Sequence, residues 1–345
     1  MKAVKLYKAG DVRIEEMPRP EPKSGEVLVR LKAVGVCGSD IHYFKDGRIG
    51  DTPIQSPLVL GHEPAGVIEG VGEGVTQFGI GDRVAVDPAL SCGVCEWCIQ
   101  GNPNLCPNVR FFGSPPVDGA FREFLTHPAH AVFKLPRGLS FADGAMLEPF
   151  GVAIHAVDLG KIRTAYTAAI LGVGSIGLCV LQLVRLSGAA KIFVTDLIDD
   201  RLDLARRLGA DVALRADDDP VERIQKLTGG RGVDVVFEAA GALDTPQQAM
   251  EILKPGGTLV LIGICPEDRI PLKASAARRK GVTIRLARRM KHVYPRAIRL
   301  AERNMVNLKC LVTHRYPLER IAEAFDVVGG YRDGVIKAII TVGEW

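Results

Sequence analysis

The sequence has almost no excess of charge of either sign. Its 345 residues include 44 Lys and Arg against 40 Asp and Glu, a formal net charge of +4 at pH 7. So small an excess gives no general basis for binding nucleic acid, and we expect no such partner. One basic stretch, residues 278–291, is interrupted by apolar residues. It is better interpreted as a solvated strand edge with one or two ligand-facing arginines than as a polyanion site.

The N-terminus lacks the continuous apolar core of a signal peptide. Residues 1–10 alternate apolar with charged side chains, which predicts a first strand and favours a cytoplasmic protein. A long uncharged run, 165–184, has the length of a membrane span. Gly172, Gly174 and Gly177 fall inside it at a spacing typical of a strand that turns into a helix. We therefore expect a buried strand and a helix there, and no membrane partner.

The composition and the hydrophobic pattern of the chain change near residue 150. Its length exceeds the usual limit for one hydrophobic core and predicts about two domains. The first part is rich in Gly, Pro and short β-branched runs, which indicate short strands joined by turns. The second part alternates strand and helix, which predicts a parallel sheet covered on both faces. The expected strands are 168–171, 192–196, 233–238 and 258–263, the expected helices end near 186, 208 and 253, and a turn is expected at 254–257. A helix at 295–302 and a strand at 335–342 are expected to return to the first domain.

Four cysteines occupy one short stretch of the first part: Cys92, Cys95, Cys98 and Cys106. Zinc favours tetrahedral thiolate coordination, and four thiolates leave no open position for water or substrate. The spacing therefore predicts a structural zinc site, and the chemistry is expected elsewhere. Two disulfides are the alternative, although Cys-x-x-Cys pairs close awkwardly small loops.

A glycine motif opens the second part. Gly172, Gly174 and Gly177 follow an apolar strand and begin a helix, which is typical of a turn that approaches a dinucleotide pyrophosphate. Asp196 ends the next strand, where a carboxylate accepts hydrogen bonds from the adenosine ribose and repels a 2'-phosphate, so NAD is favoured over NADP. Asp196 could instead cap the following helix. The predicted cofactor contacts are Gly172, Gly174, Ile176, Gly177, Asp196, Arg201, Ile262 and Ile264.

A second group of metal-binding residue types lies outside the four-cysteine loop. Cys37 is followed closely by a hydroxyl, a carboxylate and an imidazole, and His62, Glu63 and Glu148 add three more candidates. A catalytic zinc needs a few protein ligands and one exchangeable position, which Cys37, His62 and a nearby carboxylate would supply. Taken singly, such a cysteine or histidine is more often a buried core residue.

At these residues the chain resembles the zinc-dependent medium-chain alcohol dehydrogenases, and within them the sorbitol (polyol) dehydrogenases. The resemblance rests on G-V-C-G-S-D-I-H-Y at 35–43, D-G-R-I-G at 46–50, V-L-G-H-E-P-A-G at 59–66, the four-cysteine loop, F-F-G-S-P-P-V-D-G-A-F at 111–121 and L-E-P-F at 147–150. It implies an α/β fold. A Rossmann doubly wound parallel sheet at 151–289 would bind NAD, and a mainly β GroES-like catalytic domain would comprise 1–150 and 290–345.

The resemblance also implies residue roles. Cys37, His62 and Glu63 would hold a catalytic zinc, with Glu148 a fourth ligand or a partner of the metal-bound water. Asp40 would orient the imidazole of His62, although a simple turn cap is the alternative. Ser39 would hydrogen-bond the substrate oxygen and begin a proton path towards His42. Zinc lowers the pKa of the substrate hydroxyl, and hydride then passes to NAD to leave a ketone or aldehyde.

The substrate is less sharply indicated. The resemblance places Tyr43, Phe112, Glu148 and Arg289 in a polar pocket that suits a polyol, but Met290 stands where sorbitol dehydrogenases tend to carry a tyrosine. Sorbitol, xylitol, another polyol, a sugar acid or a smaller diol all remain open. A threonine- or butanediol-dehydrogenase-like activity is the enzymatic alternative, and a non-catalytic NAD-binding protein is the other. The family implies homodimers or homotetramers, with a strand such as 258–263 extending the sheet between subunits.

Overall fold

The computed structural model describes residues 1–55 and 57–343, which form two compact units. Unit 1 comprises Met1–Glu148 and Lys291–Trp345, and unit 2 comprises Pro149–Met290. In the described ranges, no helix combines the length and the apolar character that a membrane crossing needs. The uncharged run at 165–184 forms a strand and the helix that follows it, as predicted.

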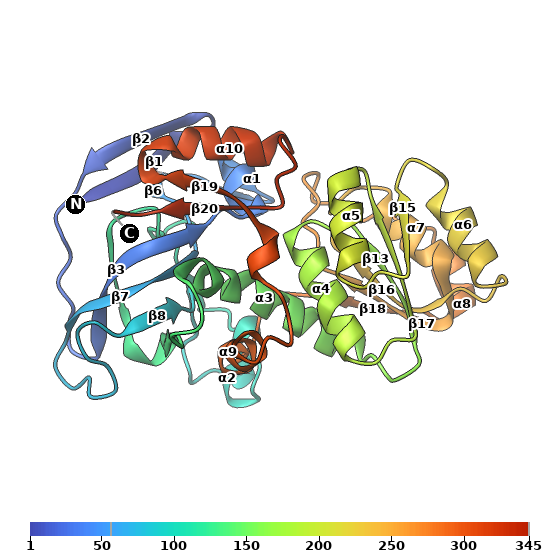
Figure 1. The fold of residues 1–345 in the computed structure, drawn as a ribbon, viewed down its shortest axis with the longest axis horizontal. Coiled ribbons are helices and arrows are strands. Elements are labelled where there is room, and N and C mark those ends of the chain that lie inside the picture. Colours follow the sequence, from blue (N-terminus) through green and yellow to red (C-terminus); the bar gives the residue numbers. More distant parts are fainter. Residues whose placement is uncertain (56, 344–345) are drawn as a thin grey trace. The chain divides into compact units, whose positions relative to one another are not determined.

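Unit 1 is mainly β-structure (Figure 1). Its strands are β1 Lys2–Lys8, β2 Asp11–Glu16, β3 Glu26–Gly35, β4 Arg48–Ile49, β5 Thr52–Pro53, β6 Leu58–Val59, β7 Glu63–Val71, β8 Arg83–Val86, β9 Ala89–Leu90, β10 Arg110–Phe111, β11 Phe124–Pro128, β12 Val132–Lys134, β19 Val312–Pro317 and β20 Lys337–Thr341. Its helices are α1 Gly38–Asp46, α2 Glu96–Ile99, α9 Tyr294–Glu302 and α10 Ile321–Gly329, with 3-10 turns at Pro103–Leu105, Ala129–Ala131, Lys309–Leu311 and Leu318–Arg320. Helix α3, Phe141–Gly160, begins in unit 1 and continues into unit 2.

Strand β3 organises unit 1, because it pairs with β7, β11 and β20. The last of these pairings brings β20, near the C-terminal end of the chain, beside β3. Buried aliphatic and aromatic residues from β3, β7, α10 and β20 form the core behind the sheet. This core holds the end of β3 and the beginning of β7, next to which the predicted ligands Cys37, His62 and Glu63 lie.

Unit 2 is a parallel sheet of six strands in the order β15-β14-β13-β16-β17-β18 (Figure 1). The strands are β13 Thr167–Leu171, β14 Lys191–Asp196, β15 Val212–Arg215, β16 Val233–Glu238, β17 Leu253–Leu261 and β18 Thr283–Leu286, and the helices are α4 Ser175–Leu186, α5 Asp199–Arg207, α6 Pro220–Leu227, α7 Thr245–Ile252 and α8 Ala274–Lys280. This is the strand order of a Rossmann sheet. The chain adds strands on one side of β13 and then, from β16 onwards, on the other, and dinucleotides bind at this switch point between β13 and β16.

Two predictions about β17 are wrong. The expected turn at 254–257 lies within β17, which begins at Leu253; the register against β16 shifts there, from Val233 opposite Leu253 to Val235 opposite Thr258. The expected inter-subunit strand at 258–263 overlaps β17, which pairs with strands on both sides. The edge strand on this side of the sheet is β18, within the basic stretch that was predicted to be a strand edge.

Candidate active site

Asp40 connects the two loops that carry Cys37 and His62. The N–H of Cys37 donates to Oδ2 of Asp40 at 2.9 Å, and the N–H of Gly61 donates to Oδ1 at 3.1 Å. The same Oδ1 lies 3.6 Å from Nδ1 of His62, and the carboxylate is fully buried. Asp40 therefore caps its own turn and also reaches a loop about twenty residues further along the chain.

Gly61 sets the backbone conformation directly before His62. Its φ is +88°, which favours glycine, and a Cβ there would stand 2.9 Å from the ring of Phe121. The backbone can therefore turn tightly over the Phe121 ring before β7 begins. The imidazole of His62 then lies beside the ring of Phe111, with centroids 5.2 Å apart.

Glu63 is paired with a lysine from the end of the chain. Nζ of Lys337 donates to Oε1 of Glu63 at 2.6 Å and also contacts Oε2. Glu63 is 0% and Lys337 2% exposed, so the pair is excluded from water. Space for it comes from Gly35, opposite Glu63 in the sheet, where a Cβ would stand 1.8 Å from Oε2.

Cys37, His62 and Glu63 can hold one metal ion together. Each offers a ligand atom, and these atoms lie within 4.8 Å of one another. Thiolate, imidazole and carboxylate are zinc ligands, and three protein ligands leave a position for substrate, so the donor set fits a catalytic zinc. Among residues of the described ranges, this group does not include Glu148.

The electrostatics of the cluster are those of a buried site. Burial, reinforced by the nearby Glu63 carboxylate, raises the pKa of Glu148 to about 8. A protonated Glu148 can donate a hydrogen bond near neutral pH. Burial lowers the pKa of His62, but the negative charges of Asp40 and Cys37 outweigh this effect and hold it well above its ordinary value.

Helix α1 carries the predicted relay residues. Ser39 and His42 are three residues apart, which places them on one face of the helix, and both are half-buried. Nδ1 of His42 lies 3.4 Å from Oδ2 of Asp46. Tyr43 is buried, with its hydroxyl 3.0 Å from that of Ser114.

Phe111 and Phe112 have different surroundings. Phe112 is buried and packs edge-on against His127, with centroids 5.2 Å apart. Phe111, which the sequence analysis did not select, is the ring beside His62. The geometry therefore favours Phe111 over Phe112 as a wall of the site.

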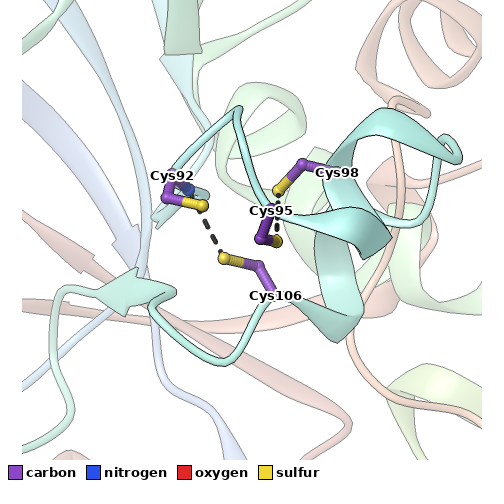
Figure 2. Close-up of side chains that lie close together, drawn as sticks. All are labelled: Cys92, Cys95, Cys98 and Cys106. Atoms are coloured by element: carbon purple, nitrogen blue, oxygen red, sulfur yellow. Dashed lines mark hydrogen bonds between the residues drawn. The ribbon is translucent and has the colours of Figure 1, made fainter.

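The four-cysteine loop folds into a closed thiolate cluster (Figure 2). The sulfurs of Cys92, Cys95, Cys98 and Cys106 all lie within 4.8 Å of one another. The Cys95 and Cys98 sulfurs are 3.4 Å apart, too far for a disulfide, and none of the four forms one. Tetrahedral zinc with ligand bonds near 2.3 Å separates its sulfurs by about 3.8 Å, so the cluster fits this metal. The N–H groups of Val94 and Cys95 lower the pKa of Cys92 to about 6, which favours the thiolate.

The glycine motif has the geometry of a dinucleotide turn. Gly172 has φ +88°, and a Cβ on Gly177 would stand 2.0 Å from the carbonyl oxygen of Gly172. Gly174 is the N-cap of α4. Asp196 accepts hydrogen bonds from the N–H of Val173 at 2.8 Å and of Ile198 at 3.1 Å. The N-cap of α5 is Ile198, so Asp196 supports the glycine loop and does not cap that helix.

The other predicted cofactor contacts surround this turn within unit 2. Arg201 lies 3.8 Å from Oδ2 of Asp196, and its guanidinium is 3.7 Å from where a Cβ on Gly174 would stand. Ile176, the second residue of α4, is half-buried, as is Ile262 directly after β17, whereas Ile264 is 50% exposed. These positions fit a dinucleotide laid along the carboxyl edge of the sheet.

Arg289 and Lys291 belong to different units of the chain. Arg289, the next-to-last residue of unit 2, lies in the left-handed region with φ 54°, and Met290 is buried. Lys291 begins the second segment of unit 1, where Nζ donates to Oδ1 of Asn102 at 2.8 Å. Lys291 is thus held by the four-cysteine loop.

Sequence reasoning missed Lys337 and Gly35. Lys337 is the only charged residue of the apolar run 335–342, and a lone lysine in a buried strand signals a buried acidic partner. Its partner is 274 residues away, and only the fold identifies it.

Comparison with protein families identifies the class. Residues 23–137 match the alcohol dehydrogenase GroES-like domain, and residues 175–303 match the zinc-binding dehydrogenase domain. The chain therefore belongs to the zinc-dependent medium-chain alcohol dehydrogenases, sorbitol dehydrogenase-like, as the motifs predicted. As a member of this family it is an oxidoreductase that uses zinc and NAD.

Individual relatives match nearly the whole chain. It is 38% identical over 341 residues to sorbitol dehydrogenase of Bacillus subtilis, covering 99% of this chain and 97% of the relative. It is 40% identical over 328 residues to the sorbitol dehydrogenase of Gallus gallus, covering 94% and 92%. An oxidoreductase of unknown specificity from Escherichia coli, involved in membrane biogenesis, has a similar structure, with a TM-score of 0.94, 34% identity and 99% coverage of both chains.

Proposed function

We propose that this protein oxidises a polyol or related secondary alcohol to the ketone, with NAD as hydride acceptor and a catalytic zinc held by Cys37, His62 and Glu63. The observation that carries the proposal is the convergence of these three ligand atoms within 4.8 Å, with His62 and Glu63 buried. The sorbitol dehydrogenases that match nearly the whole chain support the polyol substrate class. They also make a threonine- or butanediol-dehydrogenase-like activity the less favoured alternative.

The chain's own residues prepare the site for this reaction. Bound zinc would supply a Lewis acid that lowers the pKa of the alcohol. The negative charge of Asp40, 3.6 Å from Nδ1 of His62, would favour the tautomer with its proton on Nδ1, which leaves Nε2 for the metal. Ser39 and His42, on one face of α1, would carry the released proton away. Lys337 would balance the charge of Glu63.

The substrate pocket would combine hydrogen-bonding side chains with an aromatic ring. The buried Glu148 carboxyl, whose pKa burial raises, would hydrogen-bond a hydroxyl of the substrate. The Tyr43 hydroxyl, 3.0 Å from that of Ser114, would bind a neighbouring hydroxyl of the substrate. We retain Arg289 and Phe112 as pocket candidates from the family resemblance and add Phe111. A substrate with several hydroxyls suits such a set better than a simple monoalcohol.

Turnover by matched cysteine variants tests the function. NADH formation is followed with zinc-replete protein on sorbitol, xylitol, idonate, 2,3-butanediol, threonine and ethanol. We expect wild type and Cys310→Ser, a thiol outside both clusters, to prefer a polyol. Cys37→Ser should lose turnover at least a thousandfold, contain about one zinc fewer and still bind NADH. Preference for ethanol over every polyol, or an active metal-free Cys37→Ser protein, would refute the proposal.

We also propose a homodimer or homotetramer in the cytoplasm. Strand β18 is the sheet edge and exposes Ile284 and Leu286, and an uncovered apolar edge favours pairing with a second copy. The four unoxidised thiols of the closed cluster suit a reducing compartment. Sedimentation of wild type against Ile284→Lys tests the interface: loss of the oligomer is expected, and an unchanged mass contradicts it.

A further inference from the structure

Glu238 is a buried carboxylate at the carboxyl end of β16, and it has no role in the reaction as described above. It is 2% exposed. Its Oε1 accepts three hydrogen bonds, from the N–H of Ala240 at 2.9 Å, the N–H of Gly241 at 2.7 Å and the hydroxyl of Thr245 at 2.8 Å. One oxygen therefore holds the whole turn that leads from β16 towards α7.

The other oxygen of Glu238 faces the loop after β17. A Cβ on Gly263 would stand 2.8 Å from Oε2 of Glu238 and 2.2 Å from the nitrogen of Gly241. The N–H of Gly263 also donates to the main-chain oxygen of Glu238 at 3.1 Å. The loops after β16 and β17 are thus in backbone contact, with the Glu238 carboxylate against both.

The turn held by Glu238 also touches the glycine motif. A Cβ on Gly172 would stand 2.7 Å from the nitrogen of Ala240. The first glycine of the dinucleotide turn therefore has no room for a side chain because the 239–241 turn occupies it. Any displacement of this turn changes the floor of the cofactor crevice.

The strand order indicates which part of the cofactor lies here. Asp196, on β14, would bind the adenosine ribose, and the glycine turn after β13 would bind the pyrophosphate. The dinucleotide must then continue over the opposite side of β13, across the ends of β16 and β17. Ile264, half exposed in the loop after β17, fits a residue that a ligand covers.

We propose that Glu238 is a positioning residue for the nicotinamide half of NAD, acting through the backbone of residues 240–241 and 263–264. The inference rests on the proposed cofactor crevice of unit 2. Glutamate suits the position better than glutamine, because both carboxylate oxygens accept and neither donates. In Glu238→Gln the amide would direct donor protons at Gly263 or at the turn, and would displace one of them.

The same strand provides a matched control. Asp234, at the amino end of β16, is 5% exposed and accepts from the N–H and the hydroxyl of Thr167, both at 2.8 Å. It lies about 13 Å from Glu238 along the strand. Asp234→Asn therefore damages a similar network at the edge of the sheet remote from the crevice.

Ligand binding to the zinc-replete full chain tests the inference, with NADH and AMP titrated into wild type, Glu238→Gln, Asp234→Asn and Asp196→Asn. We expect Glu238→Gln to weaken NADH binding about tenfold, which is the effect of losing one hydrogen bond, and to leave AMP affinity unchanged. The KM for NAD should rise while the KM for the alcohol stays constant. Asp234→Asn should lower Tm without changing either affinity.

Four outcomes would contradict parts of the proposal. Wild-type NADH affinity in Glu238→Gln, or an equal loss for NADH and AMP, overturns the positioning role. An equal loss in Asp234→Asn shows that general destabilisation is responsible and also overturns it. Unchanged binding of both ligands to Asp196→Asn contradicts the proposed crevice itself. If Glu238→Gln does not fold, Thr245→Val removes only one of the three hydrogen bonds and should weaken NADH binding by two- to fivefold.

Discussion

Replacing Lys337 by methionine removes one charge of a buried ion pair and keeps the length of the side chain. Nζ of Lys337 lies 2.6 Å from Oε1 of Glu63, and the two side chains are 2% and 0% exposed. Glu63 then retains a buried charge without its cation. Breaking a buried pair in this way costs about 3–5 kcal/mol.

This loss of unfolding free energy can be converted into a change in Tm. For a unit of this size, one kcal/mol moves Tm by about 2–4 °C, so zinc-free Lys337→Met should melt roughly 10 °C below zinc-free wild type. Zinc beside Glu63 would replace the missing positive charge, so the loss should shrink in zinc-loaded protein. Calorimetry with and without a chelator measures both values.

A double-mutant cycle decides whether the pair is the cause. Glu63→Gln with Lys337→Met leaves no net charge in the space beside Gly35, so the double variant should recover most of the stability that Lys337→Met loses. A zinc-free shift below about 2 °C in Lys337→Met, or additive losses in the double variant, would refute the reasoning.

Three further predictions concern sites outside the catalytic cluster. Cys106→Ser should lower the zinc content from two to one per chain by elemental analysis and make the loop sensitive to protease, because a closed four-thiolate site needs every ligand. Burial lowers the pKa of His127 to about 4 from 6.5, so the unfolded chain binds the proton first as pH falls. Up to about 3 kcal/mol of stability should be lost between pH 6.5 and 4, and His127→Gln should flatten this dependence in urea unfolding. Ala165 has φ 69°, so Ala165→Gly should stabilise the protein by up to about 1 kcal/mol, measured as a higher Tm.

Local signals explain which parts of the fold could be predicted. The strand at 233–238 and the helix from 245 were predicted from apolar runs and breakers that act over a few residues. The turn at 254–257 was wrong because Pro and Gly only interrupt the register there, and neighbouring strands hold the chain in the sheet. The edge of the sheet depends on strand order, which no single segment of sequence determines.

The catalytic cluster was predicted by residue type but not by contact. Cys37, His62 and Glu63 were expected together from the family motifs, and the structure brings their ligand atoms within 4.8 Å. Lys337 was missed because its significance comes from pairing between β3 and β20, which are far apart in sequence. The space that Gly35 provides follows from the same pairing.

In both units, a buried carboxylate fixes loops that contribute to the site. Asp40 joins the loops of Cys37 and Gly61, and Glu238 joins those of Gly241 and Gly263. Glycine permits the close backbone approach, but it does not hold a loop in one position, since it restricts the chain least of all residues. A carboxylate that accepts several backbone N–H bonds supplies the missing restraint and is too buried to exchange it for water. Substitutions at Glu238 should therefore impair the cofactor site through geometry, and substitutions at Asp40 should impair the metal site both through geometry and through loss of the charge beside His62. Neither side chain needs to touch the alcohol or the cofactor.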